Sequence, residues 1–297
     1  MWLDWGPLPP IRRGLLMSPL REWQARRSLE SSWSERVLTD RDFAPGRPGL
    51  FVSLTSHRPR FENLAATLRS LLLQNLQPEA VLLWISEADS AFIPPEVSEL
   101  VAFGLCIEVC EDHGPHTKYH HALARYPEAD IAICDDDTCY PPDWLEKLVA
   151  ARRDDAIACH RAHRVVLDGD GTPKGYRYWE HDIVGPSLSP RNFGTGVGGM
   201  LLRAGLFDPS VLDIEAAMAL SPTADDLWLY FTARTGGTSF YQSGWTTPLV
   251  TWSGSQGSAL WRRNVAASGN DASLRRLLDH FGRDIALPEG ATRSLAA

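Results

Sequence analysis

One stretch, Ile131–Trp144 (IAICDDDTCYPPDW), restricts the fold more than any other part of the sequence. Its first four residues are apolar, and a bounded run of this length is typical of a buried strand. Three consecutive carboxylates follow. Pro141–Pro142 then precedes apolar residues at helical spacing, and proline suits the first turn of a helix. A strand followed by a helix in this way predicts that the acids lie at the carboxyl end of a sheet, where α/β proteins bind ligands.

The acidic triplet consists of Asp135, Asp136 and Asp137. Side chains alternate along an extended backbone, so we expect Asp135 and Asp137 to point one way and Asp136 the other. Two carboxylates on one side suit Mg²⁺ or Mn²⁺, which keep water ligands and share their coordination with substrate phosphates. A solvated acidic turn is the alternative. A calcium loop of the EF-hand type is excluded, because the glycine and the distal glutamate of that pattern are missing.

The composition excludes several classes of protein. A chain of 297 residues can form one large α/β domain or two small ones. Its formal net charge of −8 argues against a general nucleic-acid binder, which needs a basic face. No apolar run has the length of a membrane span, and we expect no signal peptide. The five cysteines lack paired CxxC spacing, so we expect a reducing, cytoplasmic setting and no structural zinc site.

From Gly49 onward the sequence alternates predicted strands with predicted helices. Apolar runs predict four buried strands, at residues 50–54, 80–85, 105–109 and 131–134. Helical periodicity and proline or glycine boundaries predict the helices between and after them, at residues 61–76, 95–103, 120–126 and 143–153. This alternation predicts a mostly parallel sheet with right-handed crossovers.

After residue 153 the pattern changes. Further strands are predicted at 156–159, 164–167 and 248–252, and helices at 223–237 and 273–281. No linker separates the two parts. We therefore predict one α/β domain over residues 49–287, with halves at 49–155 and 156–287, and a tail at 288–297.

Residues 1–48 differ from the rest of the chain. They are rich in tryptophan, proline and arginine and have poor apolar periodicity. This N-terminal extension is predicted to be flexible or docked against the domain. A basic surface that touches anionic lipid or a membrane partner is the alternative.

Six features in this order resemble the inverting nucleotide-sugar glycosyltransferases of the GT-A fold, in particular the family-2-like enzymes of bacterial surface-polysaccharide pathways. They are the strand end at 55–58, the acid after the second strand, GPHTK at 114–118, the triplet, GTGVGG at 194–199 and TADDLW at 223–228. The resemblance covers roughly residues 49–281. It implies a GT-A-like, Rossmann-related sheet, mixed and mostly parallel, flanked by helices in a single domain. It also implies transfer of a sugar from a nucleotide-diphosphate donor to an acceptor hydroxyl, in polysaccharide or glycoconjugate synthesis.

By this resemblance the triplet matches the DxD motif of the family. Asp137 would bind a divalent cation, Mn²⁺ or Mg²⁺, that bridges the donor diphosphate. Asp135 would share the metal or contact the ribose, and Asp136 would lie nearby on the nucleotide. Many enzymes of this fold add a metal ligand from late in the chain, often a histidine. The late histidine here, His280, falls on the apolar face of a predicted helix, so we expect a structural role for it.

Four further residues are predicted to bind the donor. Thr55 and Arg58 at the tip of the first strand and Glu87 after the second match the positions where the family grips base and ribose. A helix cap is the alternative for Thr55 and an exposed loop carboxylate for Glu87. Lys118 lies at a predicted helix start, where free N–H groups favour anions and a point cation could meet a donor phosphate. An exposed lysine is the alternative.

The acceptor side is predicted in the second half of the chain. Asp226 matches the catalytic base of the family, which removes a proton from the acceptor hydroxyl on the sugar face opposite the diphosphate. Asp225 would orient the acceptor or hold the loop. The alternative is that both acids begin a helix and favour its dipole. Small residues, Gly198 and Gly199, would line the floor of the site, and Trp228 is the aromatic candidate for sugar contact, although tryptophans are more often core residues.

Three other functions stay open on the sequence alone. A nucleotidyltransferase also places acids on an α/β sheet, but its basic glycine-rich signature is not evident here. A non-catalytic nucleotide-sugar or carbohydrate-binding member of the fold and a retaining transferase are the others. The predicted partners are a nucleotide-diphosphate sugar and a carbohydrate or glycolipid acceptor, with no nucleic acid. The predicted location is the cytoplasm, with a peripheral position at the inner membrane face as the alternative.

Overall fold

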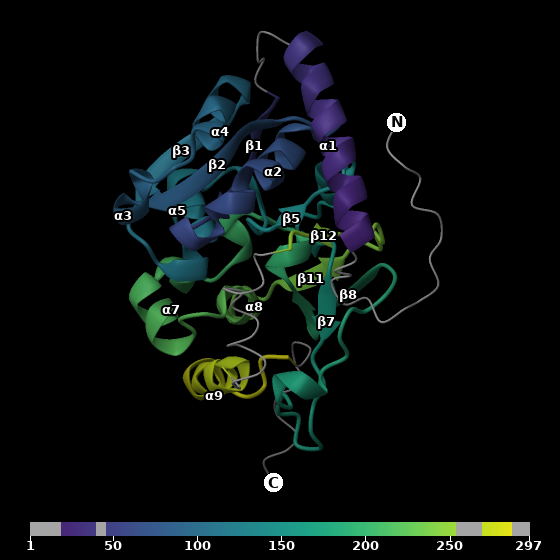
Figure 1. Cartoon of the computed structure of the whole chain (residues 1–297). Coiled ribbons are helices and arrows are strands. Elements are labelled where there is room, and N and C mark those ends of the chain that lie inside the picture. The colour runs from purple at the N-terminus through teal and green to yellow at the C-terminus, as the bar shows by residue number, and fades with distance from the viewer. Residues whose placement is uncertain (1–18, 40–45, 254–268, 287–297) are drawn as a thin grey trace.

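The computed structural model describes residues 19–39, 46–253 and 269–286 (Figure 1). Its centre is an eight-stranded sheet with the order β3-β2-β1-β4-β10-β6-β11-β8. The strands of this sheet are β1 (Arg47–Thr55), β2 (Pro78–Ser86), β3 (Leu105–Cys110), β4 (Asp130–Ile133), β6 (Ala156–Cys159), β8 (Ser187–Ser189), β10 (Met200–Leu202) and β11 (Ser239–Gln242). Two small ribbons pair β5 (Thr138–Cys139) with β12 (Val250–Thr251) and β7 (Ala162–Arg164) with β9 (Asn192–Gly194).

Helices cover both faces of the sheet. They are α1 (Pro19–Thr39), α2 (Phe61–Leu72), α3 (Glu87–Ser90), α4 (Pro95–Ser98), α5 (Thr117–Arg125), α6 (Trp144–Ala150), α7 (Ile214–Leu220), α8 (Asp225–Thr235) and α9 (Gly269–Phe281). Strand β4 shows why both faces are covered. Its Ile131 and Ile133 enter the core cluster that contains α5, α8 and α9, whereas Ala132 enters the cluster that contains α2, α4 and α6. A strand that is apolar on both sides needs partners on both sides.

The strand directions confirm the predicted α/β class with a mostly parallel sheet. Strand β1 is parallel to β2 and β4, and β2 is parallel to β3. Strand β10 is antiparallel to both β4 and β6, so those two point the same way, and β11 is parallel to β6. Only β8 and β10 among these strands run against the others. The carboxyl ends of β1, β4 and β6 therefore lie at one edge of the sheet.

The sequence did not predict several short elements. Strand β10 has three residues and lies between β4 and β6. Strand β8 also has three residues, β11 has four and α7 has seven. Segments of this length carry too few residues to show a period. Other elements are displaced: α5 begins at Thr117, before the predicted start at His120, and the strand predicted at 164–167 lies at Ala162–Arg164.

Helix α1 forms the described part of the N-terminal extension, and it is docked along one flank of the domain (Figure 1). Ala25, Leu29 and Trp33 are its buried residues, and Ala25 and Leu29 share a small core with Val250 and Trp252. The buried stripe is one residue wide and recurs every fourth position. This narrowness, with alanine as one member, explains the poor periodicity of the sequence.

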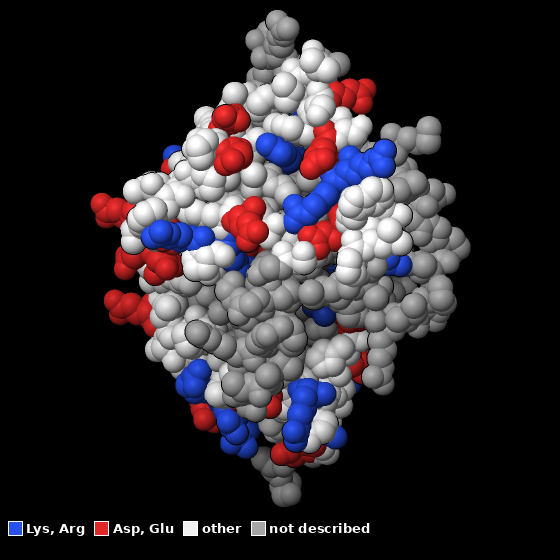
Figure 2. Space-filling model, viewed as in Figure 1, with Lys and Arg blue, Asp and Glu red and all other residues white. Residues whose placement is uncertain are grey.

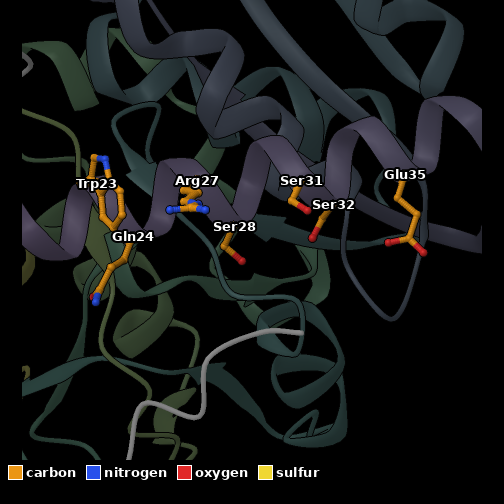
Figure 3. A pocket seen from close by; sticks show the side chains of 7 residues that line it. All are labelled: Trp23, Gln24, Arg27, Ser28, Ser31, Ser32 and Glu35. Atoms are coloured by element: carbon orange, nitrogen blue, oxygen red, sulfur yellow. The ribbon is translucent and has the colours of Figure 1, made fainter.

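Within the described ranges, no helix has both the length and the apolar character that crossing a membrane requires. On the face seen in Figure 2, the acidic and basic side chains of the described residues are interspersed. The solvent side of α1 carries a groove (Figure 3) lined by Trp23, Gln24, Arg27, Ser28, Ser31, Ser32 and Glu35. None of the predicted catalytic acids lines this groove, so it is not the candidate active site.

The docking of α1 predicts the effect of one core substitution. Leu29 is 2% exposed, so Leu29→Ala should lower the free energy of unfolding by about 2–5 kcal/mol. The matched control is Leu38→Ala on the same helix, where the side chain is 76% exposed and the change should stay within about 0.5 kcal/mol. Urea unfolding measures both, and equal effects of the two variants would contradict the docking.

Candidate functional site

A single ammonium group joins the acids from the two halves of the chain. The Nζ atom of Lys118 lies 2.8 Å from Asp135 Oδ1 and 2.9 Å from Asp225 Oδ2. Asp135 follows β4, and Asp225 is the first residue of α8. The acidic triplet and the acid pair of TADDLW therefore open onto one site at the carboxyl edge of the sheet.

Lys118 is buried and firmly placed, so the alternative of an exposed lysine is wrong. Its side chain is 7% exposed. The helix around it is tied to β1, because the Ser53 hydroxyl donates to the Lys118 carbonyl at 2.5 Å. Burial by itself would lower the pKa of Lys118. The carboxylates of Asp135 and Asp225 overcome this and raise the pKa well above its ordinary value.

The triplet does not adopt the extended backbone that the predicted alternation requires. Strand β4 ends at Ile133, and the chain turns at Asp136 and Asp137. As a result Asp136 and Asp137 share one cation: Arg60 Nη1 contacts Asp136 Oδ1 and lies 3.5 Å from Asp137 Oδ2. The expectation that Asp136 points away from Asp137 is therefore wrong. The turn replaces the two-residue period of a strand.

Arg60 is a site residue that the sequence analysis missed. It ends a short 3₁₀ helix, Arg58–Arg60, and its side chain is 12% exposed. Burial opposes its charge, but Asp136 and Asp137 raise its pKa above the ordinary value. Asp136 has a second partner, because the Ser56 hydroxyl donates to its Oδ2 at 2.6 Å. The sequence signal was the second arginine of HRPR, two positions after Arg58, which was predicted to bind the donor.

Three predicted donor-binding residues lie outside the ion pairs of the acid cluster. The Arg58 guanidinium stacks over the Phe92 ring at 3.7 Å from its centroid. The Thr55 hydroxyl donates to the Trp84 carbonyl at 2.9 Å and so links β1 to β2. Glu87 is exposed and begins α3. Their predicted roles toward the donor stay predictions.

Asp226 is partly buried and lies near Lys118. Its Oδ1 accepts a hydrogen bond from the Gly196 N–H at 2.9 Å. Burial raises the pKa of Asp226 to about 8. The neighbouring Asp225 adds to the rise, and Lys118 opposes it. Both acids do begin α8, as the alternative interpretation holds. They also face Lys118 and Gly196, so the helix start is not their whole role.

The predicted glycine floor is displaced by two residues. A Cβ atom at Gly198 would lie 2.4 Å from the Cβ of Arg161, and one at Gly199 would lie 2.6 Å from the Trp144 ring. These glycines make room for protein side chains. Gly196, which was not chosen, faces the site, because a Cβ there would lie 2.9 Å from Lys118 Nζ and 3.3 Å from Asp226 Oδ1.

Trp228 is a core residue, and its predicted contact with a sugar is wrong. It is fully buried, its indole N–H donates to the Val211 carbonyl at 3.1 Å, and its ring packs on Phe281. Two positions along a helix turn a side chain by about 200°, so Trp228 points away from the direction of Asp226. His280 also differs from expectation, because it is exposed on α9.

The residues of the triplet suit a divalent cation in charge and in donor chemistry. Among the described residues, no three His, Cys, Asp or Glu side chains are already arranged as metal ligands. The charge balance nevertheless leaves an excess of carboxylates. Burial raises the pKa of Asp137 to about 6, and Asp136 and Asp135 add to the rise, while Arg60 compensates only in part. Hard carboxylate oxygens with unbalanced charge fit Mg²⁺ or Mn²⁺, which Asp135 and Asp137 would hold.

Comparison with known proteins gives structural matches only. No protein-family model and no curated protein matches the chain. The mannosyltransferase PcManGT from Pyrobaculum calidifontis, in complex with GDP-Man and Mn²⁺, is 16% identical over 75% of this chain and 61% of its own, with a TM-score of 0.41. TarS 1-349 from S. aureus, in complex with UDP-GlcNAc, is 12% identical over 68% of this chain and 58% of its own, with a TM-score of 0.46. The chain thus spans less than two thirds of either structure.

A third match lies outside the sugar transferases. CMP:2-keto-3-deoxy-manno-octonic acid synthetase, complexed with CTP, is 14% identical over 65% of this chain and 88% of its own, with a TM-score of 0.37. Glycosyltransferases solved with nucleotide sugars, the class that the sequence resembles, are thus among the matching structures, together with a CTP-bound synthetase.

The raised pKa of Asp226 predicts a pH dependence of stability. The folded protein keeps this proton up to about pH 8, whereas an unfolded chain releases it near the ordinary value of 3.8. Between these values the folded state binds more protons, so the free energy of unfolding falls as pH rises. The isosteric Asp226→Asn cannot titrate and should lose less stability over this window, by up to about 1.4 kcal/mol per pH unit.

Urea unfolding of both proteins at several values between pH 5 and pH 8 measures this difference. Asp137 titrates in both proteins, so its contribution cancels in the comparison. The free energy of unfolding of the variant minus that of the wild type should rise with pH. A value that stays constant or falls as pH rises would contradict the assignment.

Proposed function

We propose that this protein is a metal-dependent, inverting glycosyltransferase that moves a sugar from a nucleotide-diphosphate donor to an acceptor hydroxyl. One observation carries the proposal: Lys118 contacts both Asp135 after β4 and Asp225 at the start of α8. Acids suited to a cation and an acid suited to proton transfer therefore share one site. We infer a carbohydrate or glycolipid acceptor and a cytoplasmic reaction, in polysaccharide or glycoconjugate synthesis.

On the donor side, Asp135 and Asp137 would hold Mn²⁺ or Mg²⁺ together with the donor diphosphate. The cation, when bound, supplies positive charge to the departing diphosphate. Arg60 is placed to hold Asp136 and Asp137 in their turn, so that the carboxylates keep their positions despite their mutual repulsion. The donor-binding roles of Thr55, Arg58 and Glu87 belong to the same proposal, because these residues lie at the ends of β1 and β2.

On the acceptor side, Asp226 is the proposed general base. The acceptor oxygen forms the new bond to the anomeric carbon, the bond from that carbon to the diphosphate oxygen breaks, and the hydroxyl proton moves to Asp226. Attack from the face opposite the diphosphate inverts the configuration. A base is most effective when its pKa lies near the working pH, and a pKa of about 8 meets this condition.

The two acids should fail in different ways when they are replaced. Asp226→Asn should keep donor binding and lower transfer by roughly 10²–10⁴-fold, the range for a general base. Asp137→Asn should lose Mn²⁺-dependent donor binding and transfer with it. Chromatography measures the rate of product formation and calorimetry measures donor affinity, and together they separate these effects. The control is Asp168→Asn, whose side chain is 58% exposed in a turn and which should behave as the wild type.

Further outcomes distinguish the rival functions. Full transfer by Asp226→Asn with retained anomeric configuration would identify a retaining enzyme. A wild type that binds the donor but neither transfers the sugar nor slowly hydrolyses the donor would be a non-catalytic member of the fold.

A thermal-shift panel identifies the donor. UDP-, GDP-, CDP- and dTDP-sugars are tested with Mn²⁺, and the correct donor at a hundred times its Kd should stabilise the folded state by about 2.7 kcal/mol. Asp137→Asn should remove this shift. If a nucleoside triphosphate stabilised the protein and no nucleotide sugar did, a nucleotidyltransferase would be favoured instead.

A further inference from the structure

The Lys118 ammonium is held in place from three directions. Its helix is fixed to β1 through Ser53, and its Nζ contacts one carboxylate from each half of the chain. The space for the ammonium exists because residue 196 is glycine, since a Cβ atom there would lie 2.9 Å from Nζ. A buried ammonium is stable only when it is paired in this way.

Asp135 is the member of the triplet that faces both this ammonium and solvent. Its side chain is 30% exposed, compared with 4% for Asp136 and 11% for Asp137. Its Oδ1 lies 2.8 Å from Lys118 Nζ, so Asp135 forms an ion pair with the ammonium while part of its side chain faces solvent. Asp135 is therefore the most accessible carboxylate of the triplet.

We propose that Lys118 is a positioning residue that competes with the divalent cation for Asp135 and passes to the acid pair when the cation binds. The inference rests on the proposed function, because the cation is the one that accompanies the donor diphosphate. Two positive charges cannot both stay close to one carboxylate without strong repulsion. The ammonium already contacts Asp225, so it needs only a small shift toward the acid pair.

This exchange couples the two sides of the site. When Lys118 leaves Asp135, its charge is concentrated on Asp225 and Asp226. A cation nearer to Asp226 favours the ionised form that accepts a proton. Binding of the cation with the donor therefore favours the ionised form of Asp226, and Lys118 links the two.

The test is Mn²⁺ binding to the full chain in the absence of donor and acceptor. Calorimetry and electron paramagnetic resonance measure the affinity. Lys118→Met should bind Mn²⁺ about tenfold more tightly than the wild type, which corresponds to about 1.4 kcal/mol. Lys118→Arg keeps the charge and should bind as the wild type does. Asp225→Asn should weaken Mn²⁺ binding, because Lys118 then has only Asp135 as a close partner.

The double variant separates competition from the general effect of charge. If Asp225 acts through Lys118, the effect of Asp225→Asn should fall by more than half in the Lys118→Met background. An equal effect in both backgrounds would overturn the inference, as would a Lys118→Met variant that binds Mn²⁺ no more tightly than the wild type. Circular dichroism and urea unfolding establish that each variant is folded.

Gly196→Ala provides a second measurement if Lys118→Met does not fold. Its new methyl group displaces the ammonium end of the flexible Lys118 side chain but removes no charged group. Tighter Mn²⁺ binding supports the competition, and unchanged or weaker binding overturns it. If Mn²⁺ binds neither the wild type nor any variant, the metal part of the proposed function fails as well, and transfer by Asp226 is judged by its own assay.

Discussion

The balance of buried charge at the carboxyl edge of the sheet is the interaction on which the rest of the structure depends. Lys118 and Arg60 hold acids that come from the end of β4 and the start of α8. Removing one partner from a buried ion pair typically costs about 3–5 kcal/mol. The same contacts thus hold the two halves of the chain together and set the charge of the groups that would perform the chemistry.

Much of the central fold could be predicted because β1 to β4 are largely apolar and α2 has a clear helical period. Strands β1 to β4 and helix α2 follow from these patterns alone. Strand β10 could not be found in this way. Its three residues pair on both sides with strands from distant parts of the sequence, and such pairing is a property of the whole sheet.

The site was predicted in its residue types and only partly in its geometry. The sequence indicated that Asp135, Asp225 and Lys118 carry charge at element ends, where the structure brings them together. It could not reveal the turn that directs Asp136 and Asp137 to Arg60, because an acidic triplet is compatible with strand or turn. It also favoured Trp228, since a motif records adjacency in the chain, whereas a helix sends neighbouring residues to different faces.

Helix α1 has a consequence for how the protein can be divided. Its Glu22 carboxylate accepts from the Ser253 N–H at 3.0 Å, and Arg26 reaches Asn63, whose amide donates to the Ser253 carbonyl. We call these hydrogen bonds around Ser253 the clasp. Residue 252, next to the clasp, donates its N–H to the Asp137 carbonyl. A fragment that starts at Gly49, where the repeating pattern begins, would lose the clasp and uncover the apolar surface beneath it. The start of the strand–helix alternation is therefore a poor place to cut this polypeptide. The amino-terminal helix, distant in sequence, helps to anchor the backbone behind the acids.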